Sequence, residues 1–411
     1  MKVLHSIILT VCGAFCLWLS YQTQPKYSKE NLAKSLIAEN NVVDISLITG
    51  TSGNAFQGNI IRKYDYTYFD FSETLNLNIT KQTCSVWAVV TTIFPPSDAI
   101  RLILNQTYCL VVVLDKKSDT LLWKFADNLT HVFILTVKKQ QQIFPKFSQI
   151  IPFNHFGRKN IGYLFSILHG ANNIWDFDDD NIGVPLLTLP IFSSIPTTAG
   201  ISVNPYPFFD DRQSRIWPRG LPLENIKERL IIVDNKLTKN INVGVVQSLA
   251  NNQPDVDAIF RFTREVPFNF NLNRTSAFLV PIDKFCPFNA QATLWYKQAF
   301  KYMILPITVH GRVSDIWRGY IMQKMSKQNN LHTLFVYPQV VQNRNFHRNG
   351  DDFIAEYPLY TKSECLLNHL HKQEFTDIHD LYISLYERGY VEYNDINLIK
   401  MWNYILEKYM L

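Results

Sequence analysis

Four aspartates lie within five positions of the stretch "NNIWDFDDDN", residues 172–181. Carboxylates this close repel one another, so folding them together costs free energy unless a cation or solvent offsets the repulsion. If residues 174–178 form a strand, Asp178 and Asp180 point the same way at its carboxyl end and Asp179 points away. Such a pair suits Mn²⁺ or Mg²⁺, which prefer oxygen ligands and complete their shell with water and phosphate. A solvated acidic turn and a structural calcium loop are the alternatives.

A basic turn precedes this acidic stretch. Apolar residues recur at i, i+3, i+4 and i+7 from residue 161 to residue 168, which predicts a helix. Arg158, Lys159 and Asn160 then lie in its first turn, where the helix dipole favours anions over cations. Basic residues are expected at that position if the helix start binds a phosphate. An exposed basic turn explains the residues equally well.

The elements that would position these side chains are strands alternating with helices. Continuous apolar runs at residues 85–92, 109–115 and 131–137 predict strands buried on both faces. A helix is expected between the first two, because Ser97 can cap it and apolar residues follow at helical spacing. This alternation of strand, helix and strand predicts a βαβ unit and a parallel sheet.

The N-terminal segment is set apart by composition. Residues 3–21 are almost entirely apolar and approach the ~20 residues of a membrane-spanning helix. We expect a signal-anchor over residues 1–22, with a cleaved signal peptide or a buried helix as alternatives. The first two alternatives place the rest of the chain in the secretory lumen. Outside this segment, four cysteines are compatible with two disulfides or with buried thiols, namely Cys84, Cys109, Cys286 and Cys365.

Composition also limits the class of protein. The chain is 47% hydrophobic and 18% charged, which is typical of a globular protein with a large core. Its net charge of +5 is spread out, without a Lys/Arg block that could follow a phosphate backbone, so nucleic-acid binding is disfavoured. We expect a luminal stem or extension over residues 23–83, a main domain over 84–330 and a mainly helical C-terminal region over 331–411.

Longer motifs connect these features to a known family. "RKNIGYLFSILHGANNIWDFDDDN" resembles a motif of the STELLO-type family of Golgi glycosyltransferase-like proteins. Further motifs follow in the family's order over roughly residues 84–325: "WAVVTTIFPPSDAI", "NPYPFF", "WPRGLPL", "GVVQSLANNQPDVDAIFR", "PFNAQATLWYKQAF" and "RVSDIWRGYI". A more distant likeness is to the reversibly glycosylated polypeptides, which handle UDP-sugars.

Both resemblances imply a fold and a set of site residues. The fold would be GT-A-like, a Rossmann-type mixed α/β sheet flanked by helices that binds a nucleoside diphosphate sugar. Asp178 and Asp180 would hold Mn²⁺ or Mg²⁺, with Asp179 able to replace one of them. The remaining candidates would contact the phosphates or the nucleoside of the donor: Thr91 (with its neighbour Thr92), Asp115, Arg158, Lys159 and Asn160.

Asp315, in "RVSDIWRGYI", occupies the place of the acidic general base of many inverting GT-A enzymes. A plain helix cap is the alternative role. Arg219, in the rigid turn of "WPRGLP", could present a guanidinium to phosphate or pack a loop. Weaker candidates are Asp255 and Asp257 for an acceptor site or a structural role, and His310 and His347 as late metal ligands.

We therefore expect a Golgi type II membrane protein that transfers a sugar from a nucleotide-sugar donor with the help of Mn²⁺ or Mg²⁺. The expected nucleotide is UDP. The acceptor would be a glycan or a protein, which the sequence does not specify. One alternative is a non-catalytic Golgi scaffold or trafficking partner of glycan-synthesis enzymes. Another is a metal-dependent phosphohydrolase, for which the sequence supplies no nucleophile. Secretion after signal cleavage is the alternative location.

Overall fold

The structure is a computed structural model that describes residues 62–64, 69–76, 84–190, 195–210, 212, 215–233, 241–270 and 277–409. All of these residues lie in one compact unit, Ile60–Leu411. The expected signal-anchor, residues 1–22, lies outside the described residues. Within the described ranges, no helix is both long enough and apolar enough to cross a membrane.

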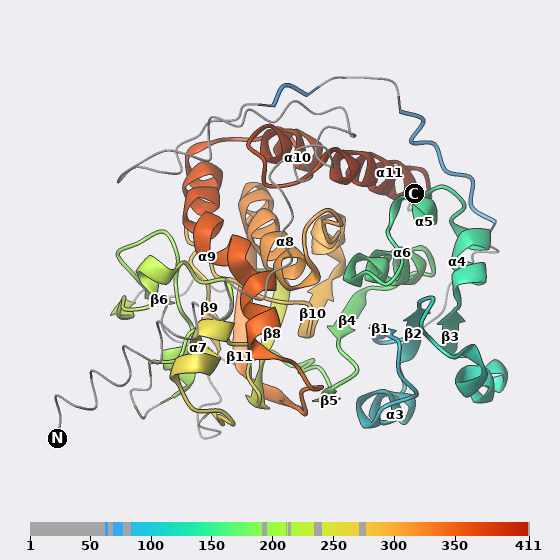
Figure 1. Ribbon diagram of the computed structural model, residues 1–411, viewed down its shortest axis with the longest axis horizontal. Coiled ribbons are helices and arrows are strands. Elements are labelled where there is room, and N and C mark those ends of the chain that lie inside the picture. The colour runs from blue at the N-terminus through green and yellow to red at the C-terminus, as the bar shows by residue number, and fades with distance from the viewer. Residues whose placement is uncertain are drawn as a thin grey trace, which may run out of the picture. The chain divides into compact units, whose positions relative to one another are not determined.

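A mixed sheet of nine strands organises this unit (Figure 1). Its strands run in the order β3-β2-β1-β4-β10-β8-β11-β5, and β9 pairs with β11. β1 to β4 are mutually parallel, β10 is antiparallel to both of its neighbours, and β11 is parallel to β8. The predicted α/β class with a sheet flanked by helices is confirmed. The strands are β1 (Trp87–Thr92), β2 (Cys109–Leu114), β3 (Val132–Leu135), β4 (Asn173–Phe177), β5 (Asn181–Gly183), β8 (Asn242–Asn252), β9 (Phe278–Leu279), β10 (Ala292–Tyr296) and β11 (Leu331–Gln342).

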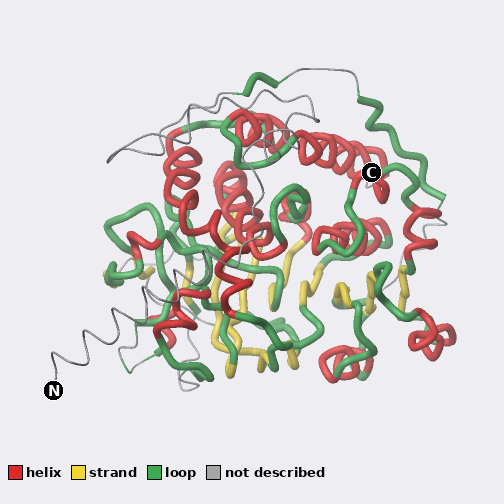
Figure 2. Tube along the Cα trace, viewed as in Figure 1, coloured by secondary structure: helices red, strands yellow, loops and turns green. Residues whose placement is uncertain are grey.

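Helices cover both faces of the sheet (Figures 1 and 2). One hydrophobic core joins the strands to the larger group of helices, and a second joins the opposite face to α3 and η2. The first group comprises α4 (Val137–Ile143), α5 (Phe147–Ile150), α6 (Lys159–Leu168), α8 (Gly311–Ser326), α9 (Asn349–Lys372), α10 (Ile378–Glu387) and α11 (Tyr393–Tyr409). α3 is Asp98–Leu104, η2 is Thr120–Asn128, and α7 (Ala258–Thr263) lies beside α9.

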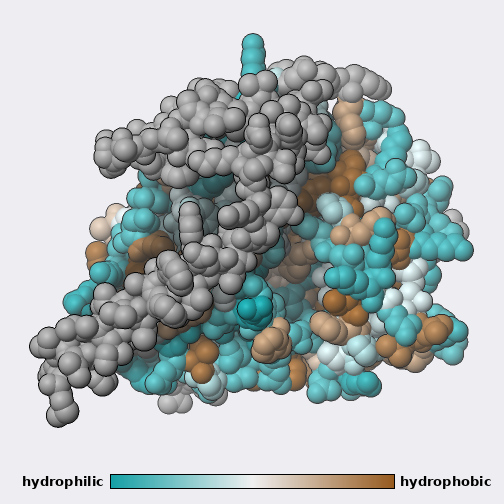
Figure 3. Space-filling view, viewed as in Figure 1, coloured by the Kyte–Doolittle hydropathy of each residue, from teal (hydrophilic) through white to brown (hydrophobic). Residues whose placement is uncertain are grey.

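Shorter elements complete the unit. β6 (Ile195–Thr197) and β7 (Ile231–Val233) form a separate two-stranded sheet. Short 3₁₀ helices are η3 (Phe156–Arg158), η4 (Tyr206–Phe209), η5 (Leu223–Asn225), η6 (Lys297–Tyr302) and η7 (Lys327–Asn329). On the visible coloured surface in Figure 3, hydrophobic residues occur in small groups among hydrophilic ones.

Helix α6 packs very closely on the parallel strands. A Cβ atom at Gly162 would lie 2.6 Å from Val89 Cγ1 and 2.7 Å from Val113 Cγ2, a separation that side-chain atoms do not tolerate. Glycine is therefore required for this approach of the helix to β1 and β2. The close packing brings the start of α6 to the carboxyl ends of the strands.

The expected domain limits differ from the observed unit in two places. Residues 331–342, which we grouped with the C-terminal helical region, form β11 inside the sheet, because they hydrogen-bond to β8, β5 and β9. The limit at residue 330 therefore does not separate compact units. The described residues of the expected stem also pack on the C-terminal helices: Arg62 pairs with Glu392 at 2.5 Å, and the Tyr409 hydroxyl donates to the Glu73 carbonyl at 3.2 Å.

One disulfide, between Cys84 and Cys109, joins the residues before β1 to the start of β2. Cys286 is a buried thiol and Cys365 an exposed thiol. The described cysteines therefore form one of the two disulfides that their number allowed.

We predict that Cys84→Ala lowers the free energy of unfolding by about 2–4 kcal/mol, because the disulfide closes a chain loop and restricts the unfolded state. Denaturant unfolding of the two proteins under non-reducing conditions measures the difference. Cys365→Ala, which removes an exposed thiol, is the matched control. Equal stabilities of Cys84→Ala and the control would contradict the prediction.

Candidate functional site

The last three aspartates of the acidic stretch, residues 178–180, follow β4 at the point where the strand order reverses. β1, β2 and β3 continue on one side of this point, and β4 and β10 lie on the other. Ligands of open α/β sheets bind outside the carboxyl ends of the strands at such a switch point. The carboxyl end of β1 reaches the stretch directly, because the Thr92 hydroxyl donates a hydrogen bond to the Asp179 carboxylate.

Buried cations pair with two of the four aspartates, Asp176 and Asp178. Asp176 is completely buried, with Lys159 Nζ 2.7 Å from its Oδ1 and Arg318 Nη1 3.0 Å from its Oδ2. The same Lys159 Nζ lies 3.0 Å from Asp178 Oδ1 and donates at 2.8 Å to the carbonyls of Phe177 and Ala290. Lys159 thus offsets much of the repulsion that the sequence predicted, and it fixes the position of Asp178.

Asp178 and Asp180 line one cavity of about 260 Å³, whereas Asp179 turns toward Thr92. Burial, together with the neighbouring Asp180 and despite Lys159, raises the pKa of Asp178 to about 7. Burial also raises the pKa values of Asp179 and Asp180. The Asp180 carboxylate accepts hydrogen bonds from the Asn181 side chain at 2.7 Å and the Gln342 side chain at 3.3 Å.

This pair of carboxylates fits a cation that takes its other ligands from water and phosphate. Among the described residues, no group of three or more His, Cys, Asp or Glu side chains is arranged to hold a metal ion. Mg²⁺ and chemically similar ions nevertheless bind through one or two carboxylates when substrate phosphates supply the remaining ligands. The residues present therefore suit an Asp-x-Asp metal site but not a closed protein cage.

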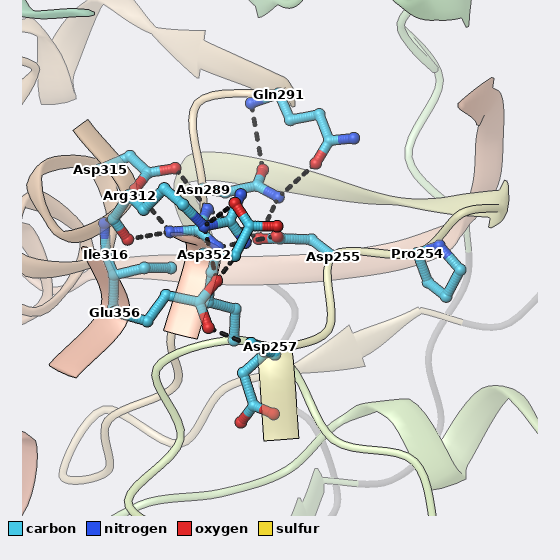
Figure 4. A network of polar contacts seen from close by, with 12 residues as sticks. Pro254, Asp255, Asp257, Asn289, Gln291, Arg312, Asp315, Ile316, Asp352 and Glu356 are labelled. Carbon is cyan, nitrogen blue, oxygen red and sulfur yellow. Dashed lines mark hydrogen bonds and ion pairs between the residues drawn. The ribbon is translucent and has the colours of Figure 1, made fainter. Parts of the chain in front are cut away.

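Arg219 forms another part of the cavity wall and joins two carboxylates. Figure 4 labels these two residues, Asp255 and Asp315, and their neighbour Asn289. Its Nε lies 2.8 Å from Asp255 Oδ1, and its Nη2 lies 2.8 Å from Asp315 Oδ2. Burial alone would raise the pKa of Asp255, but the guanidinium holds it below its usual range. Asn289 donates a further hydrogen bond to Asp255 Oδ2 at 2.8 Å. The network ties together four segments that are distant in sequence.

Asp315 faces the cavity from inside α8 and does not cap the helix. The capping residue is His310, whose Nδ1 accepts a hydrogen bond from the Arg312 amide at 3.2 Å. Both carboxylate oxygens of Asp315 accept hydrogen bonds from Arg219, at 3.1 and 2.8 Å. The helix-cap alternative for Asp315 is therefore wrong.

Basic side chains line a further part of the cavity wall. They are Arg261, Arg312, Arg344, His310 and His347. Arg312, Arg344 and His347 converge on Asp352, at 3.5, 2.6 and 3.3 Å. Arg312 also pairs with Glu356. Sequence reasoning did not single out Arg261, although it ends the quoted motif "GVVQSLANNQPDVDAIFR", and it missed Arg344, which lies outside every quoted motif.

The three residues expected at the start of α6 have side chains that are fully buried and bonded within the protein. Arg158 donates to Gln140 Oε1 at 3.0 Å, and Asn160 exchanges two hydrogen bonds of 2.8 Å with the Leu305 backbone. Lys159 binds the aspartates as described above. They position the strands, α6 and the acidic stretch, and their contact with a ligand stays a prediction.

Two other candidates lie at the ends of β1 and β2 and outside the cavity lining. Asp115 Oδ2 accepts a hydrogen bond from the Asn154 amide at 2.7 Å and lies 3.9 Å from Arg158 Nε. Thr91 pairs with Val113 in the sheet, and its side chain points to the face opposite that of Thr92. Of the two threonines, Thr92 is the one bonded to the acidic stretch.

Two curated proteins of Arabidopsis thaliana match the chain. "Probable glycosyltransferase STELLO1" is 27% identical over 346 residues, 77% of this chain and 43% of that protein. "Probable glycosyltransferase STELLO2" is 27% identical over 351 residues, with 77% and 44% covered. The chain is STELLO-like. It spans less than half the length of these two relatives.

The other comparisons add little to this STELLO-like assignment. No protein-family model matches the chain. A solved structure titled "Crystal Structure of a Mycobacterial Protein" covers 69% of this chain and 75% of its own, at 11% identity and a TM-score of 0.35. A likeness that low carries no argument about fold or function.

We predict that the free energy of unfolding of the metal-free protein falls less steeply with rising pH in Asp178→Asn than in the wild type. The folded-state pKa of Asp178 is about 7, above its usual value of 3.8. The stabilisation that protonated Asp178 gives the folded state is therefore fully present below pH 3.8 and is lost as the pH rises through 7. Chemical denaturation with a chelator at pH 5 and pH 8 measures the slope. The control is Asp351→Asn, which changes a carboxylate that is 70% exposed. A slope that matches the wild type in Asp178→Asn would contradict the prediction.

Proposed function

We propose that this STELLO-like protein is a metal-dependent glycosyltransferase of the GT-A type that uses a nucleotide-sugar donor, with UDP as the expected nucleotide. The observation that carries the proposal is the single cavity shared by Asp178, Asp180, Arg219 and Asp315 outside the carboxyl end of β4. Two carboxylates for a cation and a further carboxylate for a proton are the groups that such a transfer needs. The names of the two relatives support the same class of reaction.

Each side chain has a role in this proposal. A divalent ion held by Asp178 and Asp180 would neutralise the diphosphate leaving group as the glycosidic bond to the donor breaks. Lys159 holds Asp178 in place through its bonds to Asp176 and the β4 carbonyl. Thr92 holds Asp179 away from the cavity.

Asp315 is the proposed general base. Its carboxylate would accept the proton of the acceptor hydroxyl as that oxygen attacks the sugar. Arg219 orients the carboxylate through two hydrogen bonds. Asp255 is the second partner of Arg219 and helps to hold its guanidinium in position.

The secretory lumen is the proposed location, with residues 1–22 as a Golgi membrane anchor. A disulfide between Cys84 and Cys109 suits an oxidising compartment. Asn105 and Asn128, two of the four N-x-S/T acceptor sites, are exposed. Both observations are compatible with secretion after signal cleavage as well.

One observation favours the non-catalytic scaffold as a second candidate. The side chains of Arg158, Lys159 and Asn160, which the resemblance assigned to donor binding, are all bonded within the protein. A scaffold would use these bonds to keep the fold and would have no need of a donor.

We predict that Mn²⁺ with UDP raises the melting temperature of the full chain and that Asp178→Ala/Asp180→Ala abolishes the rise. A ligand that binds the folded state stabilises it by mass action. A panel of nucleoside diphosphates, each with and without Mn²⁺, identifies the base. Asp351→Ala is the control, because its carboxylate is exposed on α9. A folded protein that responds to no nucleotide would favour the scaffold.

We predict that Asp315→Asn lowers turnover by about 10²–10⁴-fold while Mn²⁺–UDP binding is retained, since only proton transfer is lost. Release of UDP from the donor in the presence of candidate acceptors measures turnover, and the melting temperature measures binding. Asp255→Asn, which alters the other partner of Arg219, is the comparison. Unchanged turnover in Asp315→Asn would exclude this residue as the base.

A further inference from the structure

Arg261 carries a positive charge that no carboxylate neutralises directly. Among the described residues it forms no ion pair: its guanidinium donates to Gln253 Oε1 at 2.7 Å and to the Pro254 carbonyl at 2.9 Å, and both acceptors are neutral. Its Nε atom is buried and has no hydrogen-bond partner within the described part of the chain. By contrast, Arg219 and Arg312 each pair with two carboxylates.

The surroundings of Arg261 increase this local excess of positive charge. Burial, followed by repulsion from Arg344, lowers the pKa of Arg261 to about 10, so the side chain is still charged at neutral pH. Asp255 and Asp352 lie near enough to act on it, but they are already paired with Arg219 and with Arg312 and Arg344. An anionic group of a ligand in the cavity would complement this partly buried guanidinium.

The neighbouring residue, Phe262, belongs to an aromatic surface outside the cavity. Phe262 is 58% exposed, and its ring lies 6.4 Å from that of Phe353, which is 39% exposed. Tyr357, 54% exposed, follows Phe353 at i+4 on the same side of α9. We call Phe262, Phe353 and Tyr357 the aromatic ledge.

Helices α7 and α9 hold the ledge and Arg261 in one fixed arrangement. The Ala258 amide at the start of α7 donates to Glu356 Oε2 of α9 at 2.8 Å. Glu356 also pairs with Arg312 of the cavity wall. The short α7 helix therefore places one residue, Arg261, in the lining of the cavity and the next, Phe262, on the surface beside it.

We propose that Arg261 and the aromatic ledge bind the acceptor and that this acceptor is a sugar chain bearing an acidic group. Exposed aromatic rings offer flat apolar faces on which the C–H face of a sugar ring packs, and the guanidinium fork binds a carboxylate or a phosphate. The proposal rests on the proposed transferase function and adds the class of its acceptor. The donor diphosphate belongs to the Asp178 and Asp180 part of the cavity.

The test measures binding of matched acidic and neutral oligosaccharides to the full chain by calorimetry at fixed ionic strength, with Mn²⁺ and UDP present. The probes are uronate-bearing and phosphate-bearing sugar tetramers, each with its neutral counterpart. We expect at least one acidic tetramer to bind about tenfold or more tightly than its counterpart, because hydrogen bonds to a charged group are stronger than those between neutral groups. Which of the two acidic tetramers binds identifies the anionic group.

Variants then assign the effect to residues. Arg261→Gln should remove the preference for the acidic tetramer and leave Mn²⁺–UDP binding intact, whereas Arg264→Gln, at an exposed arginine next to α7, should change neither. Phe262→Ala/Phe353→Ala should weaken acidic and neutral tetramers alike by about three- to tenfold. Phe125→Ala, at a 46% exposed ring on η2, is the control for loss of an aromatic side chain.

Three results would overturn the proposal: equal binding of every acidic tetramer and its neutral counterpart, an acidic preference that survives Arg261→Gln, or loss of Mn²⁺–UDP binding in Arg261→Gln with its fold intact. The last result would make Arg261 a donor-phosphate residue. Selective binding of an acidic tetramer by a protein that does not bind Mn²⁺–UDP would support the acidic-sugar subsite and contradict the transferase function.

Discussion

The completely buried group of Asp176, Lys159 and Arg318 is the interaction on which the site depends. It ties the middle of β4 to the first turn of α6 and to the interior of α8, with contacts of 2.7 and 3.0 Å. Removing one partner from such a buried group leaves an uncompensated charge and typically costs about 3–5 kcal/mol. Since Lys159 also holds Asp178, the same group that joins three elements sets the geometry at the carboxyl end of β4.

The charged side chains around the cavity differ in how far partners within the protein neutralise them. Arg219 is shared between Asp255 and Asp315, so each of these three charged groups has a partner of opposite sign within the protein. Asp178 retains a pKa of about 7 despite its contact with Lys159, which indicates that a second cation would favour its ionised form. Arg261 is the opposite case, a cation bonded to neutral oxygens. A ligand that brings both a metal ion and an acidic group would complement both kinds of side chain in the cavity lining.

Local patterns were sufficient to predict the parallel strands and the position of the acidic stretch, because apolar runs and Asp-x-Asp spacing are short-range features. They were insufficient wherever a partner lies far along the chain. From the helix dipole we predicted that Lys159 contacts a ligand. In the structure it is buried in the core, where it pairs with Asp176. Arg219 and Asp315 are 96 residues apart, and no motif connects them. The place of β11 depends on strand pairing that is likewise long-range.

The proposed function requires Asp178 and Asp180 to hold a divalent ion that also binds the phosphates of a nucleotide. Electron paramagnetic resonance of Mn²⁺ bound to the full chain with UDP tests it most directly, through the coupling of the metal to ³¹P. We expect a protein-bound Mn²⁺ signal with phosphorus coupling in the wild type and its loss in Asp178→Ala. A bound Mn²⁺ signal that lacks phosphorus coupling, or one that is unchanged in Asp178→Ala, would show that these aspartates do not hold a nucleotide-bound metal ion.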